Sequence, residues 1–376
     1  MLHLAYPILR RFGNDCGCSI VFSPGKSYAF TRESNVADIQ LGKRPGRVTD
    51  VPTHPPGAAA SRVGFTPEGV TLTRNYKPFV LKFTQVCHLF GVITMKIALN
   101  GATTMRAELI TDIRAVGDAG YDLVELWASK LRHYLHNHTA ADLRALLTEC
   151  NVEPYSINSI EHITFRTPED YESIKAQCGE LAAIAGEILC PYIVVVPGRL
   201  PEGGATREQI IEESVRVLNE LADIAEPHGV SLAFEFLGQT DCSVQTLDLC
   251  NEIIEKVGRK SVGNVIDTFH FYAGNSSYEA IDNMDPEKLF IFHINDAEDL
   301  PKEQLTDAQR LYPGTGILPL AEIKQHLDKI GYDRMVSIEI FRPEYWEQDP
   351  FEVARNAKIA TEKVLGLGQY AAGGSW

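Results

Sequence analysis

The sequence predicts a (β/α)8 TIM barrel that follows a basic, poorly structured N-terminal extension. First, short apolar runs alternate with longer segments of helical periodicity from Met95 onward. Second, there are eight such runs before residue 368, the number that one closed barrel needs. Third, each of the last four runs ends on or next to a residue of a kind that binds metals. We therefore expect an extension at 1–94, a catalytic barrel at 95–368 and a flexible tail at 369–376.

The first 94 residues differ in composition from the rest of the chain. They hold 11 Lys and Arg against 5 Asp and Glu, a net charge of +6, whereas residues 95–376 hold 24 against 45, a net charge of −21. The stretch 44–64 is rich in proline and glycine, which predicts loop or disorder. The N-terminus lacks the charged-then-apolar order of a signal peptide. We interpret this segment as a largely disordered appendage to a domain that begins near Met95.

The strand candidates are short runs rich in β-branched residues. They are KIALN (96–100), LVEL (123–126), PYSIN (154–158), YIVVVP (192–197), SLAFEF (231–236), SVGNVID (261–267), KLFIFHI (288–294) and MVSIEI (335–340). Continuous apolar runs are typical of strands that are buried on both faces, and intervening helices imply parallel pairing. A doubly wound open sheet is the alternative. It would carry a Gly-rich loop after its first strand, and NGATT follows here instead.

Segments with apolar residues at helical spacing lie between these runs. They cover 107–120, 142–150, 173–189, 212–229 and 244–258. Pro227 and Gly229 end the fourth segment and Gly258 ends the fifth, as expected at helix C-termini. The order strand, helix, strand is therefore repeated along the body of the chain.

Charge and cysteine content restrict the partners. A body with a net charge of −21 would repel phosphates of nucleic acid and anionic lipid, so we expect neither partner, and a small neutral substrate instead. No apolar run reaches the roughly 18 residues that a membrane span needs. The eight cysteines show no CxxC spacing, which favours reduced thiols and a cytoplasmic location. A homo-oligomer remains open.

Four charged residues end the last four strand candidates: Glu235, Asp267, His293 and Glu339. Enzymes on this barrel work at the carboxyl ends of the strands, so side chains from adjacent strand ends converge on one point. Three carboxylates and one imidazole suit one divalent metal ion, either Mn²⁺, Co²⁺, Zn²⁺ or Mg²⁺. The alternative is four separate ion pairs at the rim.

Other polar residues follow the strand candidates. His270 lies three residues after Asp267 and is expected on the loop above the metal, where it would orient a substrate hydroxyl or support a ligand. Arg342 either binds a substrate oxygen or pairs with the acids around it. Arg199 lies on a Gly- and Pro-rich loop that would cover the site, with a plain surface turn as the alternative. Glu161 is a candidate for the pocket mouth. The pairs Glu125 and Trp127, and Glu161 and His162, follow strand candidates too, and a structural role is favoured for both.

Several short motifs of the sequence resemble those of a known superfamily. LAFEF, VIDTFHF, IFHINDAED, PGTG and VSIEIFRPEY are similar to the xylose-isomerase-like barrels of sugar isomerases and epimerases. LNGATT, YDLVELW, LADIAEPHGV and LTDAQRLYPGTG most resemble the inosose (keto-inositol) isomerase family of inositol catabolism. The resemblance runs from Met95 to about Leu365. It implies that the four strand-end residues bind the metal, that Glu235 and Glu339 also move protons, and that His270 is catalytic. Several ketose epimerases place an arginine six residues beyond the metal histidine. Asp299 stands there in this sequence, which counts against a ketohexose epimerase.

The expected reaction is a proton transfer next to a carbonyl. A metal would polarise the ketone and the neighbouring hydroxyl, and one glutamate would remove a carbon-bound proton to form an enediolate. Return of the proton on the adjacent carbon would interconvert keto-inositols. A ketose epimerase and a keto-polyol dehydratase are the alternatives on the same barrel. Phosphodiester cleavage and a non-enzymatic sugar-binding role are less favoured.

Overall fold

The computed structural model describes residues 28–30, 39–41, 61–66, 69–74, 77–81 and 95–367. The chain divides into two compact units, Met1–Ile93 and Thr94–Trp376. Among the described residues, no helix is both long enough and apolar enough to cross a membrane. The expected flexible tail at 369–376 lies outside the described residues.

The first unit contains a five-stranded antiparallel sheet in the order β2-β1-β3-β4-β5. Its strands are β1 (Tyr28–Phe30), β2 (Ile39–Leu41), β3 (Ser61–Thr66), β4 (Gly69–Arg74) and β5 (Lys77–Leu81). The sequence analysis did not expect these strands. Residues 61–64 belong to β3, so the loop expectation for 44–64 is wrong at its last four residues, and 44–60 lie outside the described part. β-branched and aromatic residues in 61–81 are the local cause of the pairing.

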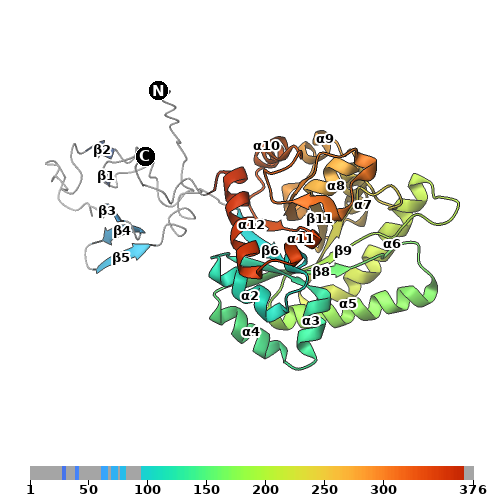
Figure 1. The fold of residues 1–376 in the computed structure, drawn as a ribbon, viewed down its shortest axis with the longest axis horizontal. Coiled ribbons are helices and arrows are strands. Elements are labelled where there is room, and N and C mark those ends of the chain that lie inside the picture. The colour runs from blue at the N-terminus through green and yellow to red at the C-terminus, as the bar shows by residue number, and fades with distance from the viewer. Residues whose placement is uncertain are drawn as a thin grey trace. The chain divides into compact units, whose positions relative to one another are not determined.

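The second unit contains a closed eight-stranded parallel barrel, which confirms the predicted fold class (Figure 1). Its strands are β6 (Lys96–Asn100), β7 (Leu123–Trp127), β8 (Glu153–Ile160), β9 (Tyr192–Val195), β10 (Ser231–Glu235), β11 (Val262–Asp267), β12 (Leu289–Ile294) and β15 (Met335–Ile338). β15 pairs with β6 and closes the ring. Each strand overlaps one of the eight predicted runs.

The alternating direction of side chains along the barrel strands divides the buried apolar residues into two clusters. Successive side chains of a strand point to opposite faces, so every second residue points into the barrel. One buried cluster includes Ala233, Val265 and Ile291, each two residues before a charged strand end. The floor of the barrel is therefore apolar, and the next inward-facing positions along these strands carry the polar groups. The larger cluster packs between the strands and the helices.

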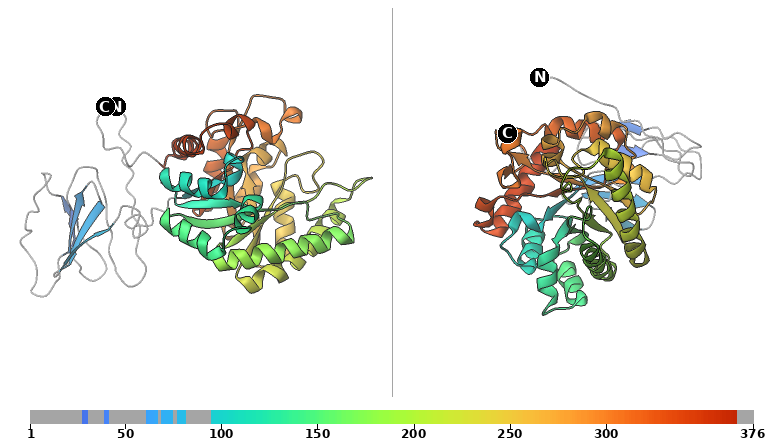
Figure 2. Two further views of the ribbon diagram at one scale, coloured as in Figure 1. Left: turned by 60° about the horizontal axis from the view of Figure 1, so that its bottom comes forward. Right: turned by 90° about the vertical axis from the view of Figure 1, so that its right-hand side faces the viewer.

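Helices surround the barrel strands (Figure 2). The longer ones are α2 (Leu109–Asp118), α3 (Ala128–Leu135), α4 (Ala140–Glu149), α5 (Pro168–Ile188), α6 (Arg207–Ala225), α7 (Leu247–Val257), α10 (Leu320–Ile330) and α12 (Pro350–Leu365). The shorter ones are α8 (Thr268–Ala273), α9 (Tyr278–Asp282) and α11 (Pro343–Trp346). The five predicted helical segments correspond to α2, α4, α5, α6 and α7. Gly258 ends α7 in the left-handed conformation, with φ of 65°, as its sequence position indicated.

Short 3-10 turns connect several elements. They are η1 (Gly101–Thr104), η2 (Glu226–His228), η3 (Pro286–Lys288), η4 (Lys302–Gln304) and η5 (Asp307–Gln309). A buried ion pair holds η1 in place. Lys130 Nζ donates to the carbonyls of Gly101 (2.9 Å) and Thr104 (2.8 Å) and to Asp112 Oδ2 (2.7 Å). Lys130 and Asp112 therefore fix the turn that follows the first barrel strand.

The loop after β12 is held by one aspartate. β13 (Asp296–Ala297) and β14 (Arg310–Leu311) form a two-stranded antiparallel ladder within it. Both oxygens of Asp296 accept backbone N–H groups, from Gly314 (2.9 Å), Gly316 (2.9 Å) and Leu318 (2.8 Å). This carboxylate folds the PGTG segment back onto the strand end and so fixes the path of the chain around Arg310.

Candidate metal centre

Four strand ends bring their charged side chains to the same edge of the barrel. Glu235 is the last residue of β10, Asp267 is the last of β11, His293 is the last but one of β12, and Glu339 directly follows β15. Because the strands are parallel, their carboxyl ends lie together. One donor atom from each residue can be chosen so that all four lie within 4.8 Å of one another. The structure thus brings together the four predicted ligands.

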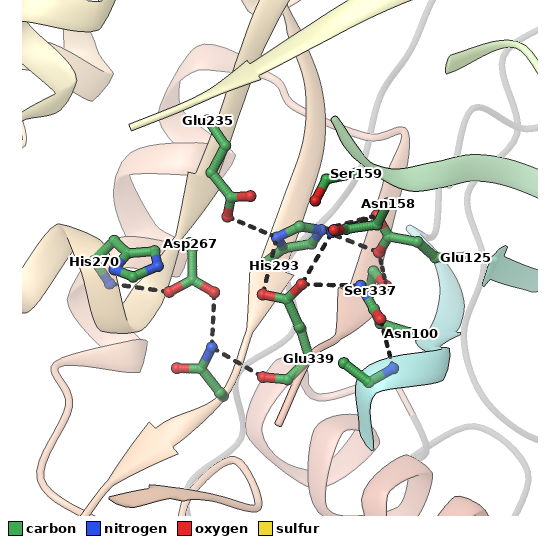
Figure 3. A network of polar contacts seen from close by, with 12 residues as sticks. Asn100, Glu125, Asn158, Ser159, Glu235, Asp267, His270, His293, Ser337 and Glu339 are labelled. Atoms are coloured by element: carbon green, nitrogen blue, oxygen red, sulfur yellow. Dashed lines mark hydrogen bonds and ion pairs between the residues drawn. The ribbon is translucent and has the colours of Figure 1, made fainter. Parts of the chain in front are cut away.

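The contacts at His293 show how closely the group is packed (Figure 3). Its Nδ1 atom lies 2.9 Å from Glu235 Oε1 and 3.4 Å from Glu339 Oε2. His293 and Asp267 are fully buried, and Glu235 and Glu339 are 3% exposed. Burial alone would lower the pKa of His293, but the charges of Glu125, Glu339 and Glu235 raise it well above its ordinary value. Burial raises the pKa of Glu339 to about 8.

Hydrogen bonds from neighbouring residues fix the orientation of two of these carboxylates. Asp267 caps helix α8, because its Oδ1 accepts the backbone N–H of His270 at 2.9 Å. Its Oδ2 accepts from Asn295 Nδ2 at 2.8 Å. Glu339 Oε1 accepts from Asn100 Nδ2 (2.9 Å) and Asn158 Nδ2 (3.0 Å). The carboxylates are therefore held in place before any ligand binds.

The donor set fits a divalent ion. Donors on opposite sides of an ion with bonds of about 2.0–2.3 Å are separated by roughly 4–4.6 Å, which is close to the largest separation in this group. Three carboxylates and one imidazole are ligands that Mn²⁺, Co²⁺, Zn²⁺ and Mg²⁺ accept. Buried carboxylates this close together repel one another unless a cation lies among them.

Glu125 is a member of the site that the sequence analysis favoured as structural. Its carboxylate lies next to the second ring nitrogen of His293: Nε2 is 3.2 Å from Glu125 Oε1 and 3.0 Å from Glu125 Oε2. Ser337 Oγ donates to Oε2 at 2.6 Å, and Asn158 Nδ2 contacts Oε1 at 3.3 Å. Burial would raise the pKa of Glu125, but His293, Ser337 and Ser156 lower it below its ordinary value. The run LVEL carried the signal, since Glu125 is a charged residue inside an apolar strand.

Arg310 is a second residue that the sequence analysis missed. It is 1% exposed, and its Nη1 donates to Asp267 Oδ2 and to Glu339 Oε2, both at 2.9 Å. Its Nη2 donates to Asp307 Oδ1 at 2.8 Å. The guanidinium lies 5.0 Å from the ring centroid of Phe269 and 5.1 Å from that of Phe341. A buried arginine close to two aromatic rings therefore forms ion pairs with two of the candidate ligands.

The position of Arg310 corrects one inference from spacing. Asp299, six residues after His293, is exposed. An arginine nevertheless reaches the site from further along the same loop. The aspartate at 299 is therefore no argument against a ketose epimerase. The sequence feature that could have located Arg310 is the PGTG segment, because Arg310 stands three residues before its proline.

His270 lies beside the candidate ligands, but on helix α8 rather than on the predicted loop. It is 3% exposed, and its Nε2 lies 3.0 Å from Arg310 Nη2. Because an arginine can only donate, Nε2 accepts and Nδ1 carries the proton. That Nδ1 atom is buried and has no hydrogen-bond partner within residues 95–367. Burial also lowers the pKa of His270, which keeps the ring neutral.

The three predicted substrate-binding residues lie in other surroundings. Arg342 pairs with Glu298 (2.7 Å) and Glu344 (3.2 Å). The side chain of Arg199 is 76% exposed and pairs with Asp241. The side chain of Glu161 is 54% exposed and lies near His162. Within residues 95–367, none of the three makes a hydrogen bond or ion pair to the four candidate ligands.

Comparisons with known proteins agree with this geometry. Residues 113–362 match the sequence profile of the family described as "Xylose isomerase-like TIM barrel". An inosose isomerase from Bacillus velezensis is 37% identical over 72% of this chain and 97% of its own length. An inosose isomerase from Bacillus subtilis is 36% identical over 72% and 98%. A crystal structure described as the IOLI protein with a binding zinc atom is 36% identical, covers 73% of this chain and 99% of that chain, and has a TM-score of 0.70.

Proposed function

The chain belongs to the xylose isomerase-like TIM barrel family, and on that basis we propose that it is a divalent-metal-dependent isomerase that interconverts keto-inositols. The single observation that carries the proposal is the convergence of Glu235, Asp267, His293 and Glu339 within 4.8 Å. Such a cluster at the carboxyl ends of barrel strands is where this fold performs chemistry. The similarity to inosose isomerases supports the substrate class, and the zinc atom of the similar solved structure supports a divalent ion.

These four residues would hold the ion. When bound, a divalent ion supplies a positive charge that polarises a carbonyl oxygen and acidifies the adjacent C–H. Glu235 and Glu339 would move the proton. They come from β10 and β15, with β11 and β12 between them in the barrel, so they approach the same point from two sides. One carboxylate would take the proton from carbon, and one would return it to the neighbouring carbon.

His270 would contact the substrate, and Arg310 would act on it through its charge. The unpartnered Nδ1–H of His270 is a free donor for a hydroxyl or a carbonyl oxygen. The guanidinium of Arg310 would stabilise negative charge that develops on oxygen during proton transfer. The substrate roles of Arg342, Arg199 and Glu161 stay predictions, and Arg342 would first have to leave Glu298.

We also propose a neutral substrate and a cytoplasmic location. The acidic body disfavours anionic substrates. Cys178, Cys190, Cys242 and Cys250 are free and buried, which fits a reducing compartment. The choice among Mn²⁺, Co²⁺, Zn²⁺ and Mg²⁺ and a homo-oligomeric state stay predictions.

The proposal is tested by proton exchange. Metal-loaded protein is incubated in D₂O with a keto-inositol, and the mixture is followed by NMR. We expect deuterium beside the carbonyl and a product in which carbonyl and hydroxyl have exchanged places, with no loss of water. An unsaturated product would instead identify a dehydratase. Inversion of one stereocentre with the carbonyl unmoved would identify an epimerase, and no deuterium uptake with any metal would refute the proposal.

A further inference from the structure

Glu125 reaches across the barrel to His293. It lies on β7, three strands from β12 in the ring. Both residues are fully buried. The carboxylate oxygens of Glu125 lie 3.2 and 3.0 Å from Nε2 of the imidazole, and Ser337 and Asn158 donate to the same carboxylate. Each oxygen of Glu125 therefore already has protein partners, and the residue has no open side for a substrate.

The two nitrogens of His293 face different groups (Figure 3). Nδ1 lies among the candidate ligands, 2.9 Å from Glu235 Oε1 and 3.4 Å from Glu339 Oε2. Nε2 faces only toward Glu125 in the contacts within residues 95–367. A ligand imidazole needs a lone pair on one nitrogen, and a carboxylate acceptor at the other nitrogen holds the proton there. The donor to an ion at this site is therefore Nδ1.

We propose that Glu125 is a positioning residue for the metal centre: it accepts the Nε2–H group of His293, holds Nδ1 toward the ion and increases the electron density on that nitrogen. Ser337 fixes Glu125 in turn through its 2.6 Å hydrogen bond. The inference rests on the proposed function only in taking the four-residue cluster as a metal site. It does not depend on which substrate is turned over.

A first test reads the coordinating nitrogen without any substitution. Two-dimensional ¹H–¹⁵N NMR of the histidine rings is recorded with the full-length protein before and after addition of Zn²⁺. We expect the Nδ1 resonance of His293 to shift on metal addition while Nε2 keeps its proton. A Zn²⁺-bound Nε2, or a spectrum without an Nε2–H signal for His293, would overturn the proposal.

A second test measures affinity for Zn²⁺ alone, by competition with a chromophoric chelator. Glu125→Gln removes the charge and keeps the shape, and we expect it to weaken binding about 10- to 100-fold. Ser337→Ala removes the hydrogen bond that fixes Glu125 but leaves the Glu125 carboxylate in place, and it should weaken binding by a smaller factor. Asp282→Asn is the matched control, because it makes the same acid-to-amide change at a carboxylate that is 17% exposed and pairs with His326 and Lys329, outside the cluster.

The outcomes separate the two proposals. Equal affinities in Glu125→Gln and Asp282→Asn would refute the positioning role. If the wild-type protein binds Zn²⁺ but shows no deuterium exchange with keto-inositols, the proposed activity fails, and the affinity comparison still decides the role of Glu125. Failure of the wild-type protein to bind Zn²⁺, Mn²⁺, Co²⁺ or Mg²⁺ would overturn both.

Discussion

Arg310 places a fixed positive charge where the proposed ion would also act. It pairs with Asp267 and Glu339, two of the four candidate ligands, and with Asp307. Before an ion binds, this guanidinium offsets part of the repulsion among the buried carboxylates. The site can therefore form before the metal binds. The contribution of Arg310 to the free energy of unfolding should depend on whether a metal is present.

Arg310→Met should destabilise the metal-free protein more than the metal-loaded protein. Removing one partner of a buried ion pair costs about 3–5 kcal/mol, because the other charge stays buried without compensation. A divalent ion neutralises the same carboxylates, so saturating Zn²⁺ should recover part of that loss. Urea unfolding with and without Zn²⁺ measures both values. Arg334→Met, at the opposite end of the barrel and paired with Glu287, is the control and should lose the same amount in both conditions.

Glu339→Gln and Glu235→Gln should each lower kcat while the barrel stays folded. A positioned acid or base typically contributes a factor of about 10² to 10⁴, and an amide cannot accept the carbon-bound proton. Steady-state rates with a keto-inositol, circular dichroism and Zn²⁺ affinity together check the prediction. Glu187→Gln, an exposed glutamate on α5, should behave as wild type. Rates within threefold of wild type in both site variants would exclude these glutamates as the proton carriers.

The residues that sequence alone identified share one property. Glu235, Asp267, His293 and Glu339 each terminate an apolar run, so their position along the barrel follows from the strand boundary. Arg310 comes from the middle of a loop, and only the folding of that loop around Asp296 brings it to the site. The contact between Glu125 and His293 depends on which strands face each other across the barrel, which no local pattern states.

At the scale of single elements, the turn η1 depends on a buried ion pair. Lys130 on α3 holds two carbonyls of the turn and Asp112 on α2. Thr104 Oγ1 donates to the other oxygen of Asp112 at 2.7 Å. The turn directly follows Asn100, which donates to Glu339. This clamp of Lys130, Asp112 and Thr104 thus supports the site, although it makes no hydrogen bond to a candidate ligand within residues 95–367.

Lys130→Met should destabilise the protein more at pH 8 than at pH 6. Burial raises the pKa of Asp112 from 3.8 to about 7, against the lowering effect of Lys130, so removing Lys130 raises it further. An acid with a raised pKa in the folded state favours folding at low pH, and that advantage is lost as the pH rises through the folded-state value. We expect a loss of about 3–5 kcal/mol at pH 8 and a smaller one at pH 6, measured by urea unfolding.

The double variant Lys130→Met/Asp112→Asn is the control for this pH dependence. It has no ionisable group at the clamp, so its loss of stability relative to wild type should not increase from pH 6 to pH 8, unlike that of the single variant. Identical losses at pH 6 and pH 8 in Lys130→Met would mean that removing Lys130 does not raise the folded-state pKa of Asp112.

The regular elements were predictable to different degrees. The eight barrel strands and five of the helices follow from apolar periodicity, because burial on both faces of a parallel sheet leaves a continuous signal in the sequence. Strands β1 to β5 were missed. In that region strands of three to six residues stand among proline and glycine, and antiparallel pairing depends on partners that local composition does not reveal.

At the scale of the whole molecule, the barrel contains all residues of the proposed site. The boundary between the two units falls between Ile93 and Thr94 in the sequence, and the candidate ligands all belong to the second unit. The relatives that match over 96–98% of their own length cover 72% of this chain. The second unit should therefore be sufficient for folding and metal binding.

A chain that begins at Met95 should fold and bind Zn²⁺ with the affinity of the full chain, within about threefold. The reason is that the barrel closes through the pairing of β15 with β6, which begins at Lys96. Circular dichroism and thermal unfolding measure folding, and chelator competition measures the affinity for Zn²⁺. A shorter chain that begins after β6, at residue 106, is the negative control, because it cannot close the ring. Loss of folding in the Met95 chain would show that the first unit is required.

The carboxylate of Asp296 has a consequence for recognising distant relatives. By gathering the amides of the PGTG segment, it fixes the end of the loop and leaves its middle free to differ in length, since each added residue costs little closure entropy. A search pattern that counts a set number of positions from the strand-end histidine will miss an arginine that a longer loop brings to the same place. Counting backwards from the proline–glycine turn instead should locate the equivalent arginine whatever the intervening length.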